Sequence, residues 1–243
     1  MSYVDRPDPR GFAAQLDRAR RSTATFDPDE AHTEAHGWTL DHYEADLPPE
    51  PPGPPVPGGS FETARRILHD YDFPDPRLIT GIYSPDDPLE GRPMVLRARF
   101  LMFTFWLGVR VSGVIDQVTT TEDGPVHEWG YGYTTLEGHF ERGHITFRVR
   151  KAARTGAVSV HIDAVSKPDH IRNPFYRAGF KLFGRRLQVR FARTSLERIE
   201  RFVRQELAQA PPPERDTVSV ERPDAEARRE LERHDPTRSP SDA

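Results

Sequence analysis

The sequence of 243 residues contains no cysteine. Disulfide bonds and thiolate chemistry are therefore excluded, and a zinc site would have to use histidine and carboxylate ligands alone. Long apolar runs are also missing, because the most apolar stretch, residues 100–111, includes Arg110 and is too short to span a bilayer as a helix. The N-terminus shows no apolar signal region. We therefore expect a cytoplasmic protein without a transmembrane segment.

The sequence also lacks the common motifs for nucleotide binding and hydrolysis. No Gly-x-Gly-x-x-Gly joins a strand to a helix, and neither Gly-Lys-Ser/Thr nor Gly-x-Ser-x-Gly occurs. The net charge of −4 provides no overall attraction to nucleic acid or to anionic membranes. We expect no nucleic-acid partner, no cofactor and no metal, and the oligomeric state stays open.

Proline and charge are abundant, with 24 prolines and 30% charged residues, and they concentrate outside the strand-like region. Composition predicts a polar, poorly ordered segment over 1–36, a single domain over 37–210 and a disordered tail over 211–243. Within the first segment, Phe12, Leu16 and Ala19 have helical spacing, so residues 9–21 are either a weak helix or disordered. Residues 48–58 are predicted to form a stiff proline-rich linker that crosses the surface.

The ordered elements begin with a loosely alternating strand over residues 38–47. Ser60 is predicted to cap a helix whose apolar positions run from Phe61 to Tyr71, and Phe73-Pro74-Asp75-Pro76 ends it. Residues 77–83 form a short strand. Further strands with period-two alternation follow, with turns near Gly108, at Asp123-Gly124 and at Thr155-Gly156.

Short turns between these strands indicate an antiparallel meander, with a bulge or bend at Gly113. After Asn173-Pro174 the pattern is helical to about residue 210, with breaks expected at Gly179 and Gly184. The apolar side of this helix must cover the sheet. The fold class is therefore α+β, with a curved antiparallel sheet of about six to seven strands wrapped on a long C-terminal helix.

The order of elements resembles the helix-grip fold, the Bet v 1 or START-like architecture, in which a cavity often remains between sheet and helix. Several segments resemble uncharacterised protein family 0548, a family of unknown function. They are Pro48 to Ser60, Pro88-Leu-Glu-Gly-Arg92, Trp129 to Gly143, and Asn173 to Arg186. The resemblance spans roughly residues 38–191, and it implies no established activity, substrate or catalytic residue.

Trp129-Gly-Tyr-Gly-Tyr-Thr-Thr, residues 129–135, is the most distinctive strand. Trp129, Tyr131 and Tyr133 lie on one face, and Gly130 and Gly132 lie on the other, because strand side chains alternate. Glycine weakens a strand, so the bare face predicts a close approach by a helix or by a ligand.

Two candidate sites follow from these residues. An apolar pocket between sheet and terminal helix would bind a small hydrophobic or amphipathic molecule, lined by Trp129, Tyr131, Tyr133, Phe100 and Phe147. Glu137, His139, Glu141 and His144 lie close in sequence and suit a metal ion or acid–base chemistry. The favoured interpretation is structural: the first three bond to the loop backbone and fix the turn, with Gly138 and Gly143 at positive φ. Glu137, His139 and Glu141 are also candidate ligand-binding residues at the mouth of the pocket.

Other polar sets are interpreted as solvated faces. His161 and Asp163 share the outer face of a strand with Ser159, too far apart for a nucleophilic triad. The arginines of the terminal helix form a basic face diluted by Glu197 and Glu200, and the strand arginines Arg97, Arg99, Arg148 and Arg150 need acids or an anionic ligand nearby.

The sequence therefore favours a non-catalytic binding module for a small apolar or amphipathic ligand. One alternative is a protein–protein interaction domain that uses the proline run or the basic helix. A less favoured alternative is a hydrolase or isomerase that uses the loop of Glu137, His139 and Glu141.

Overall fold

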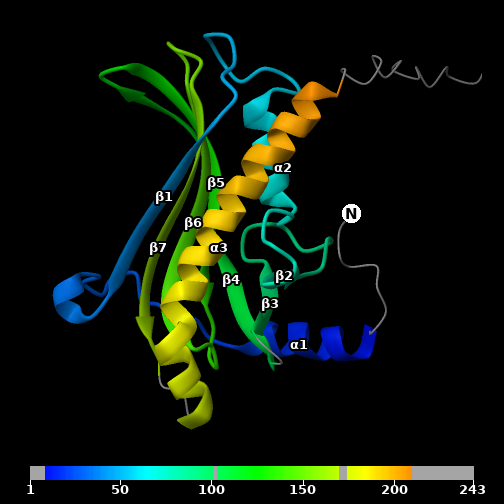
Figure 1. Ribbon diagram of the computed structural model, residues 1–243, viewed down its shortest axis with the longest axis vertical. Coiled ribbons are helices and arrows are strands. Elements are labelled where there is room, and N and C mark those ends of the chain that lie inside the picture. Colours follow the sequence, from blue (N-terminus) through cyan, green and yellow to red (C-terminus); the bar gives the residue numbers. More distant parts are fainter. Residues whose placement is uncertain (1–8, 101–102, 170–173, 210–243) are drawn as a thin grey trace, which may run out of the picture. The chain divides into compact units, whose positions relative to one another are not determined.

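The alternating segments of the sequence pair into one antiparallel sheet (Figure 1). The structure is a computed structural model that describes residues 9–100, 103–169 and 174–209, and no side-chain detail is described for residues 9–11, 100, 103 and 174–183. The chain divides into two units, residues 1–208 and 209–243, and all the elements named below belong to the first. The tail predicted to be disordered, 211–243, lies outside the described residues.

The sheet contains seven strands in the order β1-β7-β6-β5-β4-β3-β2, so every neighbouring pair except β1 and β7 is consecutive in sequence. The strands are β1 (Thr39–Leu47), β2 (Ile79–Ile82), β3 (Pro93–Phe100), β4 (Phe103–Thr121), β5 (Gly124–Thr135), β6 (Glu141–Ala152) and β7 (Val158–Pro168). The pairing confirms the antiparallel meander, and the register shift between Val111 and Gly113 confirms the bulge.

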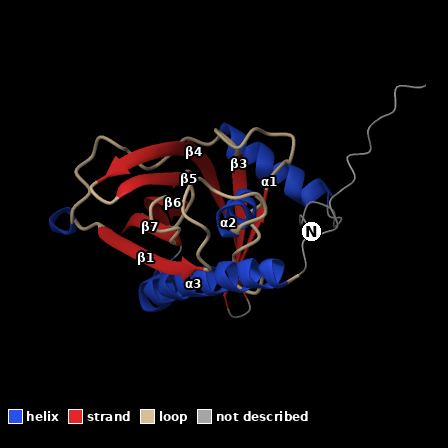
Figure 2. Ribbon diagram, turned by 90° about the horizontal axis from the view of Figure 1, so that it is seen from above, coloured by secondary structure: helices blue, strands red, loops and turns tan. Residues whose placement is uncertain are grey.

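One face of the sheet forms the main hydrophobic core. Strand side chains alternate, so Phe147 and Val149 of β6 and Val160 and Ile162 of β7 point to the same side and are buried there. Two helices cover this face: α2 (Ser60–His69) lies within the curve of the sheet, and α3 (Pro174–Ala208) lies beside it (Figure 2). The predicted α+β helix-grip arrangement is confirmed.

The helix α3 presents an apolar stripe to this core. Phe191, Leu196, Ile199 and Val203 are buried, and the arginines on the opposite side are exposed: Arg186, Arg190, Arg193, Arg201 and Arg204. The helix is continuous from Pro174 to Ala208, so the predicted breaks at Gly179 and Gly184 are wrong. A glycine costs a helix only about 1 kcal/mol, so a single glycine does not have to end it.

A second, smaller core lies under the N-terminal helix α1 (Pro9–Arg21). Ala19 packs with Ile82, Val95 and Leu136, and Phe12 and Leu16 contact the same cluster. Of the two predictions for residues 9–21, a weak helix or disorder, the helix is therefore the one observed. After a stretch that includes the short 3-10 helix η2 (Glu34–His36), the chain enters β1. The limits predicted for the domain from composition, 37–210, stay a prediction.

Two local predictions were wrong. Gly108 lies inside β4 and pairs with Val95, so the turn predicted near Gly108 is wrong. Gly59 is the N-cap of α2, whereas the Ser60 hydroxyl donates to the carbonyl of Pro48 at 2.6 Å. In both cases a residue that the local pattern assigned to a turn or a cap pairs instead with a residue distant in the chain: Gly108 with Val95, and Ser60 with Pro48.

Candidate functional site

The predicted aromatic lining residues lie against α2 and the loop that follows it. Trp129, Tyr131, Tyr133 and Phe147 are buried, and the rings of Phe73 and Phe147 lie 4.8 Å apart between centroids. The Tyr131 hydroxyl donates to the carbonyl of Leu68 at 3.1 Å. Phe100 ends β3, and its side chain lies outside the described part of the structure. Whether these residues line a ligand site stays a prediction.

The glycine face of β5 is approached closely, but by the neighbouring strand. A Cβ at Gly130 would lie 2.3 Å from the Phe147 carbonyl oxygen, and one at Gly132 would lie 2.5 Å from Nε2 of His144. The two glycines thus make room for β6 and for side chains that lie across β5. The expectation of a helix or ligand on this face was wrong because the backbone of a paired strand can crowd the same space.

The loop of Glu137 to His144 sends its side chains to different partners. Glu137 is exposed, and Nδ1 of His139 accepts a hydrogen bond from the Glu141 backbone N–H at 3.0 Å. Nε2 of His144 lies 2.9 Å from the Ser112 hydroxyl. Within the described residues these groups do not converge on one point where they could share a metal ion.

The positive φ predicted in this loop holds at Gly138, with φ 86°, and was wrong at Gly143. Gly143 lies within β6, where a Cβ would come 2.5 Å from the carbonyl oxygen of Val165 on the next strand. Close strand pairing therefore explains this glycine.

Burial shifts the pKa values of two groups in this loop in opposite senses. It raises the pKa of the Glu141 carboxyl to about 7, and it lowers the pKa of His139 to about 4. The Gln188 amide of α3 donates to Glu141, which places this carboxyl between sheet and terminal helix. His139 is neutral at pH 7 and serves the turn, whereas Glu141 titrates near neutrality.

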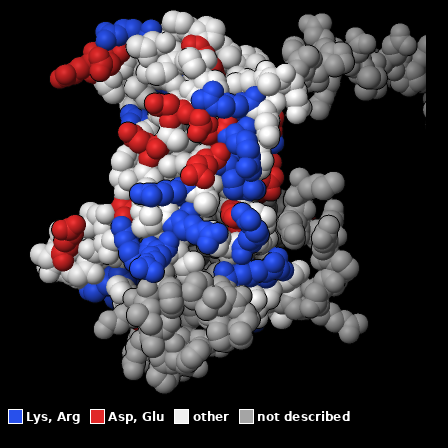
Figure 3. All heavy atoms as spheres, viewed as in Figure 1, with Lys and Arg blue, Asp and Glu red and all other residues white. Residues whose placement is uncertain are grey.

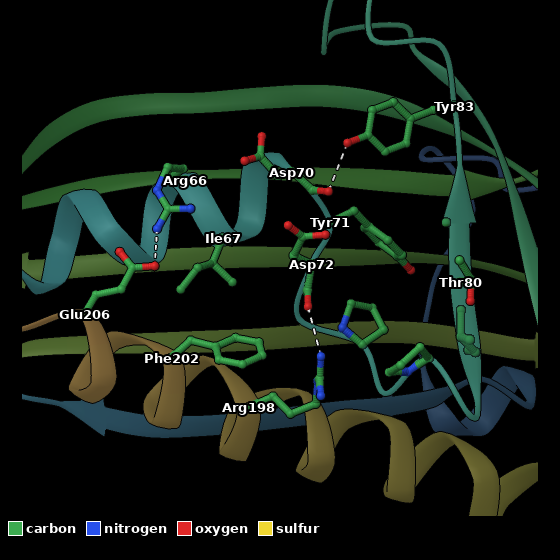
Figure 4. A pocket seen from close by; sticks show the side chains of 14 residues that line it. Arg66, Ile67, Asp70, Tyr71, Asp72, Thr80, Tyr83, Arg198, Phe202 and Glu206 are labelled. Carbon is green, nitrogen blue, oxygen red and sulfur yellow. Dashed lines mark hydrogen bonds and ion pairs between the residues drawn. The ribbon is translucent and has the colours of Figure 1, made fainter. Parts of the chain in front are cut away.

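A pocket of about 400 Å³ opens between α2, β2 and α3 (Figure 4). The residues that line it come from the end of α2, the following loop, β2 and the last turns of α3: Arg66, Ile67, Asp70, Tyr71, Asp72, Pro74, Pro76, Ile79, Thr80, Gly81, Tyr83, Arg198, Phe202 and Glu206. Its volume falls within the usual range for small-molecule sites.

The loop after α2 shapes one wall of this pocket. Tyr71 adopts φ 55°, which turns the chain sharply after the helix, and Phe73 is buried against the sheet. Pro74 and Pro76 follow and prevent the helix from continuing. The Asp75 carbonyl accepts hydrogen bonds from Leu78 and Ile79, which leads the chain into β2. The rigid loop thereby holds its two prolines at the pocket wall.

Charged groups occupy the α3 side of the pocket. The Arg66 guanidinium pairs with Glu206 between α2 and α3, as the dashed line in Figure 4 shows. Nε of Arg198 donates to the Phe73 carbonyl at 2.9 Å, and its guanidinium lies 4.9 Å from the centre of the Phe202 ring. Burial raises the pKa of the Asp72 carboxyl above its usual value, and it lowers the pKa of the Arg198 guanidinium below its usual value. The wall is therefore amphipathic.

The pocket touches the predicted aromatic row at one point. The hydroxyls of Tyr71 and Tyr133 lie 3.4 Å apart, and both rings are buried. Arg198 and Asp72 were not among the site residues predicted from the sequence. Their only signal was position: Arg198 lies one residue from the apolar stripe of α3, and Asp72 comes directly before the proline loop.

Two of the four strand arginines, Arg148 and Arg150, have the acidic neighbours that were predicted. Arg148 pairs with Glu128 at 2.7 Å and with Asp163 at 2.6 Å. On the face that carries α3, basic and acidic side chains lie next to one another (Figure 3). In the described part of the chain, no helix combines the length and apolar character needed to cross a membrane.

The curved sheet, the terminal helix and the pocket beside them define an α+β helix-grip domain. The chain belongs to the DUF1990 family, described as a domain of unknown function, which matches residues 21–198. This assignment agrees with the resemblance to an uncharacterised family that the motifs indicated. No curated protein matches the sequence.

Three solved structures are similar to this chain at low sequence identity. Norcoclaurine synthase of Thalictrum flavum, a point mutant with a transition-state analogue, has TM-score 0.43 and 9% identity, covering 70% of this chain and 96% of the other. Ara h 8.0201 has TM-score 0.38 and 11% identity, covering 70% and 99%. A Thermus thermophilus protein has TM-score 0.42 and 14% identity, covering 71% and 100%. These values assign neither ligand nor activity here.

Proposed function

We propose that this domain binds a small amphipathic molecule in the pocket between α2, β2 and α3. The observation that carries the proposal is the composition of the pocket wall. Ile67, Ile79 and Phe202 offer apolar surface, and Asp72 and Arg198 offer charge within the same volume of about 400 Å³. Binding sites of this kind combine an apolar lining with a few polar groups that orient the ligand.

The predicted aromatic row supports the site from behind. Tyr133 contacts Tyr71, which lines the pocket, and Phe147 packs against Phe73 in the same loop. In this proposal the aromatic residues of β5 and β6 hold the loop that forms the pocket wall.

The test uses the full chain and the fluorescent probe 1-anilinonaphthalene-8-sulfonate. We expect the probe to bind the wild-type protein and to bind Ile79→Trp at least tenfold more weakly, because the indole fills the pocket. Leu40→Trp is the matched control, since Leu40 is exposed on β1 away from the pocket and its substitution should leave binding unchanged. Near-ultraviolet circular dichroism checks that all three proteins keep fixed tertiary packing.

Native mass spectrometry of the purified protein adds an independent readout for a copurifying small molecule. If nothing copurifies and the probe binds Ile79→Trp as tightly as the wild type, the pocket is not a binding site and the proposal fails.

A second candidate function is acid–base catalysis by Glu141. Its carboxyl lies between β6 and α3, accepts a hydrogen bond from Gln188, and has a pKa raised by burial to about 7. A carboxyl that titrates near the working pH can both donate and accept a proton, which an isomerase or a hydrolase requires. A carbon-13 NMR titration of Glu141 tests this directly, and an ordinary glutamate pKa would exclude this role.

A further inference from the structure

The outer face of the two strands β1 and β7 brings together three side chains that can ligate a metal ion. His42 and Glu44 lie two residues apart on β1, and His161 lies directly opposite Glu44 on β7. Ligating atoms of the three residues all lie within 4.8 Å of one another. Because Val160 and Ile162 point into the core, strand alternation places His161 on the face opposite to the pocket.

One nitrogen of this group is buried without a partner. His161 is 7% exposed, and its Nδ1 makes no hydrogen bond to any described residue. The nearest acceptor, Oε2 of Glu44, is 3.5 Å away, beyond the usual 2.7–3.2 Å for an N–H···O bond. A buried ring nitrogen left unpaired costs free energy, which an ion at this position would recover.

The other nitrogens of the two rings are already held. Nε2 of His161 lies 2.8 Å from the Ser159 hydroxyl, and Nδ1 of His42 lies 2.6 Å from Oδ1 of Asp163. Metal-binding histidines characteristically donate their second N–H to such a partner, which orients the ring and leaves the other lone pair free. Here the second nitrogens are Nδ1 of His161, which makes no hydrogen bond to a described residue, and Nε2 of His42, which makes a long hydrogen bond of 3.4 Å to Oε2 of Glu44. Both nitrogens face Glu44.

Two of the three spacings between the ligand atoms match those around a tetrahedral ion. Oε2 of Glu44 lies 3.4 Å from Nε2 of His42 and 3.5 Å from Nδ1 of His161. Zinc bonds of about 2.0–2.1 Å in tetrahedral geometry place neighbouring ligand atoms about 3.3–3.4 Å apart. Two imidazoles and one carboxylate form a ligand set that zinc uses, with the fourth position left to water.

The local charge permits a cation. Around the three ligands, ion pairs join the carboxylates of Glu44, Asp163 and Glu128 to the two histidines and to the guanidiniums of Arg148 and Arg150. The carboxylate of Asp46 lies on the same exposed face of β1, so carboxylates outnumber guanidiniums here. Arg148 and Arg150 are engaged with those acids.

We infer that His42, Glu44 and His161 form a binding site for a divalent transition-metal ion of the zinc type. The ion would join the edge strand β1 to β7, with Asp163 and Ser159 as positioning residues. The inference is independent of the small-molecule pocket, because none of these residues lines it.

The test is a calorimetric titration of the chelator-stripped full chain with zinc sulfate at pH 7.5. We expect one equivalent to bind to the wild type, and binding to weaken at least 100-fold in His161→Gln and in Glu44→Gln. Asp163→Asn should weaken it 10–100-fold through loss of ring orientation. His36→Gln is the control, because His36 is an exposed histidine whose Nδ1 bonds to Thr33, and it should bind as the wild type does.

Glu44→Gln guards against a folding artefact, since its side chain is exposed and its loss leaves the core intact. The Co²⁺ form of the wild type should also show the intense visible absorption of tetrahedral cobalt, and the Glu44→Gln protein should not. A wild type that binds no zinc, or a Glu44→Gln protein that binds it as tightly as the wild type, would overturn the inference.

Discussion

Nζ of Lys151 lies 2.6 Å from Oε2 of Glu50, and solvent reaches 0% of the lysine side chain and 3% of the glutamate side chain. The ammonium also donates to the Pro54 carbonyl at 2.7 Å, and the carboxylate accepts the backbone N–H groups of Val56 and Phe61. This ion pair anchors the proline-rich segment to the end of β6. Residues 48–58 are thus held by a specific buried contact, beyond the stiffness that their prolines supply.

Removing the lysine leaves a buried carboxylate without its cation. We expect Lys151→Met to lower the free energy of unfolding by about 3–5 kcal/mol in urea denaturation. Lys167→Met is the control, because Lys167 lies 4.0 Å from Glu30 and is 35% exposed, and it should cost less than about 1 kcal/mol. The double variant Glu50→Gln/Lys151→Met should recover part of the loss. Strict additivity of the two single changes would contradict the pairing.

The glycines of β5 should respond differently to alanine. The Cβ of Gly132→Ala meets the ring of His144, so we expect a loss of about 1–3 kcal/mol that His144→Ala partly reverses. The Cβ of Gly130→Ala meets the Phe147 backbone carbonyl, so no side-chain truncation on β6 should rescue it. Thermal unfolding of the singles and doubles gives both coupling energies. Equal rescue at the two positions would show that side chains alone decide the fit.

Stability should depend on pH through Glu141. Burial raises the pKa of this carboxyl from 4.5 to about 7, so the folded state holds a proton that the unfolded chain has released. The contribution of Glu141 to stability is therefore present below pH 4.5 and is lost as pH rises to about 7. Glu141→Gln should match the wild type at pH 4.5 and exceed its stability at pH 8. A difference between the two that does not change with pH would contradict the shift.

His139 works in the opposite direction. Its pKa falls from 6.5 to about 4 on burial, so its contribution to stability is present above pH 6.5 and is lost as pH falls toward 4. The pH ranges over which Glu141 and His139 change stability overlap. The difference in free energy of unfolding between the wild type and Glu141→Gln therefore measures the effect of the carboxyl alone. The same urea titrations at each pH, carried out on both proteins, provide that difference.

The buried tyrosines of β5 should differ in what their hydroxyls contribute. The Tyr131 hydroxyl donates to the Leu68 carbonyl at 3.1 Å, so Tyr131→Phe should cost about 1 kcal/mol. The hydroxyls of Tyr133 and Tyr71 lie 3.4 Å apart, a long contact, so Tyr133→Phe should cost less. Urea denaturation compares the two. A larger loss for Tyr133→Phe would assign that hydroxyl a stronger partner.

The strand pattern could be predicted because it depends on alternation within each segment. Apolar residues two apart along β6 and β7 must face one side, and short turns must join antiparallel neighbours. The Gly113 bulge followed from a glycine in a strand. The prediction of a turn near Gly108 was wrong because a glycine in a strand and a glycine in a turn have the same local sequence pattern. Only the pairing of Gly108 with Val95 distinguishes the two.

The candidate sites depended on which distant residues meet, so little of them could be predicted. Strand alternation predicted aromatic side chains on one face of β5. In the structure, Tyr71 and Phe73 of the loop after α2 pack near that face, against Tyr133 and Phe147. Arg198 of α3 donates a hydrogen bond to the Phe73 carbonyl of that loop, a contact that depends on the position of α3.

The sequence by itself determined the elements, their order and the face that each strand would bury, because these follow from residues close together in the chain. It also excluded disulfides and the nucleotide motifs considered. Tertiary structure alone decided that Glu50 lies beside Lys151, that β6 crowds the glycines of β5, and that His161 on β7 faces Glu44 on β1. Such contacts depend on strand register and helix position, which local spacing does not encode.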